Sequence, residues 1–449
     1  TPGCYALPLV DRNYMFMLRE KVLQCEAKIL DRIMITDLLT QDGTVVGAVG
    51  FDTGEGNFYT IKAKATILST GSSTFKMPGW KDFYWTADGE AMSYRAGAEI
   101  TSKEFGGKDH GTLKDFPSTT SGILAGYDRF VNSEGEPFAS RYTSGFSGMD
   151  HRMICSLFEA HAGRAPIFID FEKATPKEKK RVADSLELQG YSWWADRVGF
   201  DVTKAGKIEM AFGSWTGRQP VIGGVVVDTK CESKVSGLYA AGDCAGTRMC
   251  GSLYSPIGYG LAGAAVTGYR AGQNAAEFAL KAKQPVIDEK EVARLKEIVY
   301  TPLSRNGGFS PGFLTQMLRN TMVPYYIMQI KHGERLQAAL TLIKFLGNHI
   351  CPKLRARDAH ELRMAHEGRN MALNAEMVLR ASLFRTESRG SHYREDFPRR
   401  NDPDWLAWTV IKQEQGEMKL FKRPIPKKWW PDLSKPYEER YELRFPAEL

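Results

Sequence analysis

The stretch that decides the fold is Gly223–Gly272, which reads GGVVVDTKCESKVSGLYAAGDCAGTRMCGSLYSPIGYGLAGAAVTGYRAG. At its centre the apolar run Leu238–Ala241 ends at Gly242 and Asp243, which is typical of a short buried strand followed by a tight turn. Ligands of open α/β sheets bind outside the carboxyl ends of the strands. The Asp243 carboxylate is therefore placed to accept hydrogen bonds from ligand hydroxyls. The small-residue run Gly260–Ala276 predicts a helix whose N-terminus faces the same place.

This segment resembles the second FAD-contacting segment of the fumarate reductase/succinate dehydrogenase flavoprotein family. That family includes L-aspartate oxidase and, more distantly, the α subunit of adenylylsulfate reductase. The GxYAAGD pattern also occurs in many flavin disulfide reductases and oxidases, and an ordinary parallel strand and turn is the alternative. The resemblance implies FAD contacts from the segment and the loop after it, at Gly223, Gly224, Gly242, Asp243, Ser252, Ser255 and Tyr259.

Two earlier segments extend the resemblance. The sequence AKATILSTG, which ends at Thr70 and Gly71, resembles the AKxxxLATG strand that lines the adenosine side of FAD in the family, although any buried strand could read this way. The stretch Thr86–Ile100 resembles the family's TGDGxxMxxRAGAE. There Asp88 and Gly89 would start a helix that packs beneath the flavin, and Gly97 would end it.

A C-terminal segment carries the longest match. Phe384–Pro398, FRTESRGSHYREDFP, resembles the signature that ends the helical domain of succinate dehydrogenase flavoproteins. The implied fold is α/β, with a partial FAD-binding Rossmann-like domain of the glutathione-reductase type, an inserted α+β capping domain and a C-terminal helical domain. The expected units are FAD-binding segments at 1–105 and 216–286, a cap at 106–215, a helical domain at 287–410 and an extended tail at 411–449.

The first 60 residues lack a feature that the resemblance requires. A flavoprotein of this type should open with a strand and a Gly-x-Gly-x-x-Gly loop that cradles the FAD pyrophosphate. Residues 1–60 instead predict a helix over 11–28, with Met15, Leu18, Val22 and Leu23 at helical spacing, and a three-stranded meander over 33–61. We expect that the N-terminal dinucleotide-binding half is missing from this sequence or belongs to a separate chain.

Composition and charge exclude several classes of protein. The chain has 449 residues, 43% hydrophobic and 25% charged, so two to four globular units are expected. A formal charge of +7 without arginine- or lysine-rich runs that alternate with aromatics argues against nucleic-acid binding. The seven cysteines form no C-x-x-C pair and the eight histidines form no constellation, so no metal or iron–sulfur site is expected in this chain. No apolar stretch approaches 18 residues, and a cytoplasmic protein, or one held at a membrane through partners, is expected.

The cap departs from the family where substrate is bound. Ala125–Arg129 stands in place of an RGEGG segment, Met149 takes the position of the arginine in an S-R-D triplet that delivers the proton in fumarate reduction, and Gln219–Gly224 replaces H-Y-x-M-G-G. A dicarboxylate clamp needs cationic donors at fixed places. Several of these cations are absent, so the sequence predicts a substrate other than succinate or fumarate.

Five residues are candidates for the catalytic side of the site. Arg248 follows GDCAG at about the place of the family's substrate-binding arginine, and Tyr254 lies in the same loop. His110 comes one position after the place of a family histidine, and Arg129 and Arg152 belong to the cap. For each arginine, an ordinary ion pair is the alternative.

The function implied is that of the flavoprotein subunit of an FAD-dependent oxidoreductase. Hydride would pass between flavin N5 and a substrate closed in by the cap. An iron–sulfur partner would exchange the electrons, because this chain has no ligands for a cluster. Two alternatives stay open: a stand-alone FAD oxidase or ene-reductase of this fold, and a flavin-less structural subunit.

Overall fold

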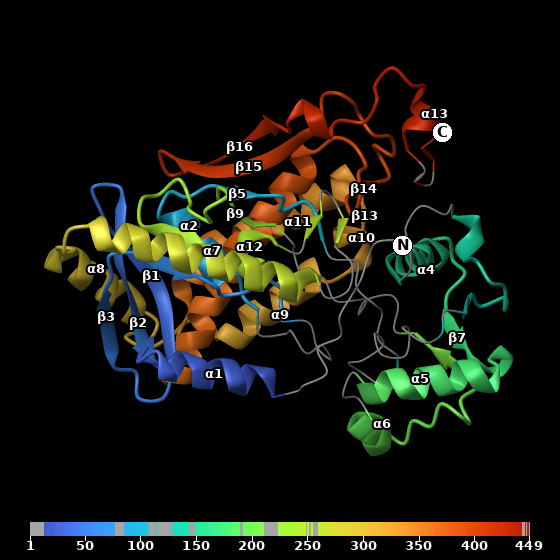
Figure 1. Ribbon diagram of the computed structural model, residues 1–449, viewed down its shortest axis with the longest axis horizontal. Helices are drawn as coiled ribbons and strands as arrows, with labels where there is room; N and C mark the ends of the chain where they lie inside the picture. Colours follow the sequence, from blue (N-terminus) through green and yellow to red (C-terminus); the bar gives the residue numbers. More distant parts are fainter. Residues whose placement is uncertain are drawn as a thin grey trace.

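The computed structural model describes most of the chain. The described residues are 13–76, 85–106, 114, 127, 129–142, 149–188, 192–210, 223–247, 249, 250, 253, 254, 259–441, 445, 447 and 448. Figure 1 shows a main body of strands and long helices, a hairpin along its upper edge, and a smaller lobe of helices and short strands to one side.

An antiparallel meander begins the described fold. It contains strands β1 (Ile33–Gln41), β2 (Thr44–Asp52) and β3 (Phe58–Lys62), in the order β1-β2-β3. The β1–β2 turn is Asp42-Gly43, and both residues have positive φ, as a two-residue hairpin turn requires. The meander predicted from alternation and turn residues is confirmed.

The segment that decides the fold forms a parallel pair. Strand β10 (Leu238–Ala240) lies beside β4 (Thr66–Leu68), with Leu238 opposite Thr66. The parallel pairing brings the ends of the two strands to the same edge, where helices α2 (Asp88–Arg95) and α7 (Tyr259–Lys281) also begin. The short strands β11 (Met249–Cys250) and β12 (Leu253–Tyr254) lie in the loop between β10 and α7.

Segments that are far apart in the sequence form a four-stranded antiparallel sheet in the order β16-β15-β5-β9. Its strands are β5 (Ile100–Thr101), β9 (Gly224–Val225), β15 (Ala407–Glu414) and β16 (Glu417–Pro424). The sequence predicted an extended tail over residues 411–449. The structure instead has a hairpin there, closed by Gln415 and Gly416, both with positive φ, and the short helix α13 (Tyr437–Arg440) follows it.

The helical region packs around one long central helix. Its helices are α8 (Glu289–Tyr300), α9 (Pro311–Met322), α10 (Tyr325–Met328), α11 (Gly333–Phe345) and α12 (Ala359–Phe384). The apolar side chains of Leu336, Leu340, Ile343 and Leu346 are buried in its core. Asp358 caps α12, because its Oδ1 accepts a hydrogen bond from Glu361 N at 2.8 Å.

The smaller lobe has a core of its own. It consists of β6 (Phe130–Val131), β7 (Phe168–Asp170), β8 (Lys207–Glu209), α4 (Met149–His161), α5 (Pro176–Leu188) and α6 (Ser192–Val198). The lobe meets the main body where Phe158 packs edge-on against Tyr393, with ring centroids 5.1 Å apart. Tyr393 belongs to β14 (Tyr393–Arg394), which pairs with β13 (Ile330–Lys331).

Helix α1 (Tyr14–Gln24) differs from its expected packing. The predicted apolar positions form a helix, but none of them is buried; Met15 is 58% exposed and Leu18 is 55% exposed. None of the helices in the described ranges combines the length and the apolar character that crossing a bilayer requires. No three His, Cys, Asp or Glu side chains in those ranges are grouped to hold a metal ion.

Candidate flavin site

Three separate segments of the sequence meet at Gly89. The Gly89 N–H donates to Thr70 Oγ1 at 3.1 Å, which joins the end of β4 to the start of α2. A Cβ on Gly89 would lie 2.2 Å from Thr70 Oγ1 and 2.9 Å from Cys244 Sγ. Because only glycine fits this close approach, the segments LSTG (68–71), ADGE (87–90) and AAGDC (240–244) pack directly against one another. We call these three segments the floor of the candidate site.

The turn after β10 is held against the first turns of α7. Gly242 has φ +62°, a conformation that favours glycine, and its N–H donates to Thr267 Oγ1 at 2.9 Å. Thr267 Oγ1 in turn donates to Gly263 O at 2.6 Å. The half-buried Asp243 follows directly, at the carboxyl end of β10, as the sequence predicted.

The glycine pair before this segment allows close packing of the backbone. A Cβ on Gly223 would lie 2.1 Å from Thr101 O, and one on Gly224 would lie 2.4 Å from Cys244 O. These glycines therefore let β9 fit between β5 and the turn that carries Asp243.

A buried ion pair lies beside the floor. Lys103 Nζ bonds Glu90 Oε2, and the two side chains are 0% and 1% exposed. Burial raises the pKa of the Glu90 carboxyl, the Lys103 charge opposes that rise, and Asp243 is close enough to add to it. Burial also raises the pKa of the Cys244 thiol to about 12, so this cysteine is a neutral packing residue at ordinary pH.

Asp88 links two helices. Its Oδ2 accepts from Thr86 Oγ1 at 2.6 Å and its Oδ1 accepts from Asn370 Nδ2 at 2.7 Å. Burial raises the pKa of this carboxyl. Because both carboxylate oxygens accept hydrogen bonds from protein groups, Asp88 holds α2 against α12. Its role toward a ligand would be to position α2 rather than to contact the ligand.

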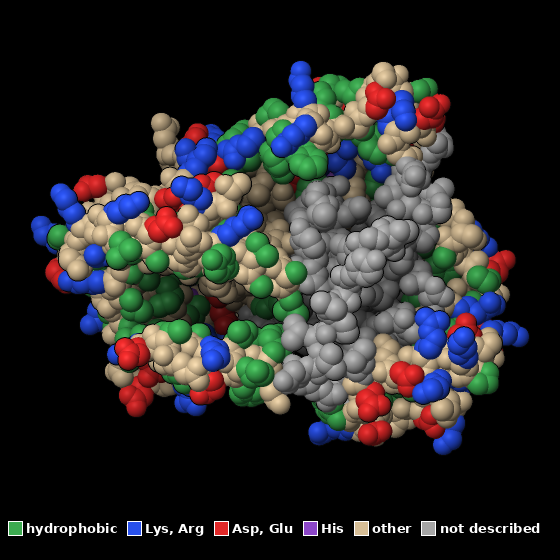
Figure 2. Space-filling view, viewed as in Figure 1, with side chains coloured by type: hydrophobic (Ala, Val, Ile, Leu, Met, Phe, Trp, Pro, Cys, Tyr) green, Lys and Arg blue, Asp and Glu red, His purple; other side chains and the backbone are tan. Residues whose placement is uncertain are grey.

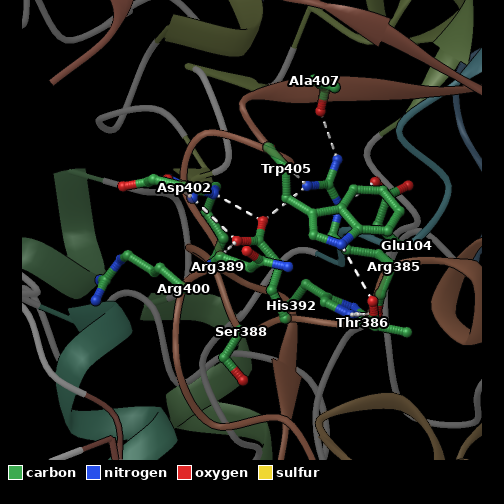
Figure 3. A network of polar contacts seen from close by, with 12 residues as sticks. Glu104, Arg385, Thr386, Ser388, Arg389, His392, Arg400, Asp402, Trp405 and Ala407 are labelled. Atoms are coloured by element: carbon green, nitrogen blue, oxygen red, sulfur yellow. Dashed lines mark hydrogen bonds and ion pairs between the residues drawn. The ribbon is translucent and has the colours of Figure 1, made fainter. Parts of the chain in front are cut away.

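The C-terminal segment builds the network drawn in Figure 3. Arg385 is 1% exposed, and its Nε donates to Glu104 Oε1 at 2.7 Å while its Nη2 donates to Ala407 O at 2.7 Å. Burial, followed by the charge of Lys331, holds the pKa of His392 well below its usual range. The His392 imidazole is therefore neutral, and its Nδ1 lies 3.0 Å from Lys331 Nζ.

The comparisons with known proteins agree on one family. Residues 315–441 match the model of the fumarate reductase flavoprotein C-terminal region. The chain is 27% identical over 431 residues to a fumarate reductase (CoM/CoB) of Methanothermobacter marburgensis, in an alignment that covers 92% of this chain and 75% of the relative. By these matches the chain is similar to flavoproteins of the fumarate reductase/succinate dehydrogenase family. Its relatives include an FAD-dependent oxidoreductase.

Other relatives and solved structures support this similarity. An uncharacterised FAD-dependent oxidoreductase of Methanocaldococcus jannaschii is 28% identical over 426 residues, 91% of this chain and 74% of that protein. A chain of Escherichia coli quinol fumarate reductase superposes with a TM-score of 0.79 at 21% identity, covering 95% of this chain and 76% of that one. Adenylylsulfate reductase of Archaeoglobus fulgidus gives 0.72 at 24% identity, covering 88% and 72%. The fold is therefore the FAD-binding α/β fold of this family, with a helical C-terminal region.

The floor suits the flavin that the family binds. Thr247 Oγ1 is buried and has no hydrogen-bond partner among the described residues. It follows Gly246, which has φ +68°. The half-buried carboxylate at Asp243 and the hydroxyl at Thr247 lie on one short, small-residue ribbon, so they provide an acceptor and a donor for a polar ligand at the end of β10.

The remaining predicted site residues are of three kinds: those described in full, those described only in their backbone, and those outside the described residues. Gly71 has φ +77° and a Cβ there would lie 3.4 Å from the Trp85 indole. Arg129 Nε lies 3.3 Å from Asp170 Oδ2 in the smaller lobe, which is the ion-pair alternative. Arg152 lies on α4, Tyr254 on β12 and Tyr259 at the first position of α7, although their side chains are outside the described set. His110, Arg248, Ser252 and Ser255 lie outside the described residues.

Sequence reasoning missed the Glu90–Lys103 pair. Glu90 falls at an unspecified position of the TGDGxxMxxRAGAE pattern, and Lys103 directly precedes Glu104. No local signal marks the pair, because both stretches carry other charges, with Asp88 close to Glu90 and Glu104 directly after Lys103.

Proposed function

We propose that this chain is the flavoprotein subunit of an oxidoreductase that acts on a substrate other than succinate or fumarate and exchanges electrons with an iron–sulfur partner. The observation that carries the flavin part is the convergence of Thr70, Gly89 and Cys244 beneath the turn that holds Asp243. When bound, FAD supplies two-electron chemistry at its N5 position.

Side chains of this chain would bind the FAD and orient the substrate beside it. The Asp243 carboxylate would accept hydrogen bonds from flavin hydroxyls, and Thr247 Oγ1 would donate one. Thr70 and Gly71 would approach the adenosine side, and Ser252, Ser255 and Tyr259 would line the loop between β10 and α7. The proposed substrate-side groups are Arg248, Tyr254, His110 and Arg152, which would orient the substrate and move its proton.

The altered substrate preference rests on the cap. Arg129, the last residue of the segment that stands in place of RGEGG, has its Nε 3.3 Å from Asp170 Oδ2, and the Asp170 side chain is 4% exposed. This ion pair with a buried carboxylate weakens Arg129 as a ligand for a dicarboxylate. We accordingly propose residues 106–215 as the cap that selects the substrate, with flavin segments at 1–105 and 216–286 and a helical unit at 287–410. Residues 411–449, expected as an extended tail, form a C-terminal segment that contains β16 and α13.

The test compares flavin content, metal content and turnover. Wild-type protein purified with its native partners should show flavin absorbance, contain iron, and fail to reduce fumarate with a reduced viologen dye. The Asp243→Asn variant should lose FAD, whereas Asp404→Asn, at an exposed position, should keep it. Unchanged FAD content in Asp243→Asn would defeat that contact. Rapid fumarate reduction would overturn the substrate assignment, and iron-free protein that oxidises substrate with O₂ would favour the oxidase alternative.

A further inference from the structure

The hairpin β15–β16 and the turn after it carry an exposed basic surface with aromatic residues. Over residues 407–430 there are six Lys or Arg residues and two Glu, so the segment is net positive. Figure 2 shows Lys and Arg side chains gathered along the upper edge of the molecule, over these strands. We call this the basic hairpin surface and define it by Trp408, Lys412, Lys419, Lys422, Lys427, Lys428 and Trp429.

The charges on this surface are arranged at a cost to the free protein. Lys412 and Lys419 are directly opposite in the antiparallel register. Like charges in that position destabilise a strand pair. Lys412 lies 3.5 Å from the half-exposed Glu414 carboxylate, which is a weak surface ion pair. Lys419 and Lys422 lie on β16, at an open sheet edge where lysines guard against pairing with another chain. Lys412 lies on β15, directly after the two residues that pair with β5, Val410 and Ile411.

Two exposed indoles accompany the charges. Trp408 is 41% exposed and Trp429 is 70% exposed. Tryptophan is among the residues that dominate binding energy at protein interfaces. Trp408 lies on β15 and Trp429 in the short 3-10 helix Lys427–Trp429. The hairpin and turn do not form an amphipathic helix of the kind that inserts into a bilayer surface. A protein partner therefore fits this surface better than a membrane does.

The basic hairpin surface is connected to the candidate flavin site. Lys422 Nζ lies 3.8 Å from the centre of the Trp405 ring, and Arg385 Cζ lies 4.8 Å from the same ring. Arg385 forms an ion pair with Glu104. The residue before Glu104 is Lys103, which forms an ion pair with Glu90 beside Asp243. In the sheet, β16 and β9 are three strand spacings apart, about 15 Å.

We propose that the basic hairpin surface is the docking site of an acidic, one-electron carrier protein of the iron–sulfur class. The inference rests on the proposed function and adds the surface through which electrons pass. A hydride leaves two electrons and one proton on the flavin. The electrons pass singly to two oxidised clusters, each reduced by one, and the proton goes to solvent. Positive charge steers an acidic carrier to this surface, and the indoles hold it there.

The experiment uses the flavin-loaded chain and a reduced plant-type ferredoxin as the acidic probe, in the reverse direction of electron flow. Flavin reduction is followed by stopped-flow absorbance at low and high salt. Lys412→Gln/Lys419→Gln should lower the second-order rate about tenfold at low salt and weaken its salt dependence. The matched control, Lys180→Gln/Lys204→Gln, removes the same charge from exposed lysines of the smaller lobe and should leave the rate unchanged.

Two further measurements separate the ways in which the experiment can fail. Reduction of the same variants by dithionite reports whether flavin is bound and competent; if the wild type binds no flavin, the proposed function fails. If flavin is bound and reduced normally but the hairpin variants accept electrons from ferredoxin as fast as the wild type, only the docking inference fails. Binding of the wild type to vesicles of anionic phospholipid, lost in the hairpin variants while ferredoxin rates stay equal, would assign the surface to a membrane and overturn the protein partner.

Discussion

Lys103 and Glu90 form an ion pair that is shut off from solvent, directly beside the turn that carries Asp243. Their burial means that each charge depends on the other for compensation. Glu90 Oε1 has no hydrogen-bond partner among the described residues, so the pair is incompletely satisfied.

Replacing one member of the Glu90–Lys103 pair should lower the free energy of unfolding more than replacing both. Lys103→Met leaves a buried carboxylate without its cation and should lower the free energy of unfolding by about 3–5 kcal/mol. The double variant Lys103→Met/Glu90→Met should recover most of that loss, because an apolar pair of similar volume replaces the ions. Urea unfolding measures both. A double variant as unstable as the single one would mean that packing, rather than charge, sets the cost.

Substitution of Gly89 should disrupt the floor of the candidate site. In Gly89→Ala the added methyl meets Thr70 Oγ1 and Cys244 Sγ, and overpacking of this kind costs about 1–3 kcal/mol. FAD content should fall along with the melting temperature. The matched control is Gly272→Ala on α7, where a Cβ meets nothing within 4 Å. That change should raise stability by roughly 0.5–1 kcal/mol, and equal losses in both variants would contradict the contact at Gly89.

His366 should make stability fall with acid. Its imidazole is buried, its Nε2 lies 3.0 Å from Val299 O, and burial and then the charge of Arg369 lower its pKa to about 4. The unfolded chain binds a proton near pH 6.5, well above the folded pKa, so the unfolded state holds more protons between these values. Stability present above pH 6.5 is therefore lost as the pH falls towards 4.

The difference between the folded and unfolded pKa values of His366 also gives the size of its effect on stability. The contribution from His366 amounts to about 3 kcal/mol across the window. Chemical denaturation at pH 7 and at pH 5 measures part of it, and His366→Gln should reduce the difference between the two pH values. A wild type and a variant with the same pH dependence would show that His366 titrates normally in the fold.

Arg385 should not tolerate replacement by lysine. Its guanidinium reaches Glu104, Glu387 and two backbone carbonyls at once, a set that a single ammonium cannot contact. Arg385→Lys should lower the free energy of unfolding by about 2–4 kcal/mol, because buried acceptors lose their donors. The exposed Arg357→Lys, just before the start of α12, is the control and should change stability by less than about 1 kcal/mol. A tolerant Arg385→Lys would indicate that water enters the network.

Local chemistry explains which parts of this molecule could be predicted. The turn Asp42-Gly43 carries its own conformational preference, so the meander was evident in the sequence. The hairpin at 407–424 was not, because it turns at Gln415, a residue uncommon in the left-handed region, and because Thr409, Val410 and Ile411 are all buried and show no alternation.

The site shows the same division between local and distant information. The turn at Gly242 and Asp243 was predicted because it is continuous in sequence with the strand before it. The pairing of Glu90 with Lys103 depends on how the chain returns from α2 to β5, and no local pattern encodes that return. Helix α1 illustrates a further limit: periodicity identifies an apolar face, but not what covers it.

The pairing of β4 with β10 joins residue 66 to residue 238, and the whole smaller lobe lies between them in the chain. The entropy cost of closing a loop grows only with the logarithm of its length, so doubling the inserted segment costs about 0.6 kcal/mol. The floor can therefore stay constant while the insertion is lengthened, shortened or exchanged. In this architecture an exchange of the inserted lobe costs little chain entropy. Chimaeras that carry another protein's lobe in place of residues 106–215 would therefore test our proposal that this lobe selects the substrate.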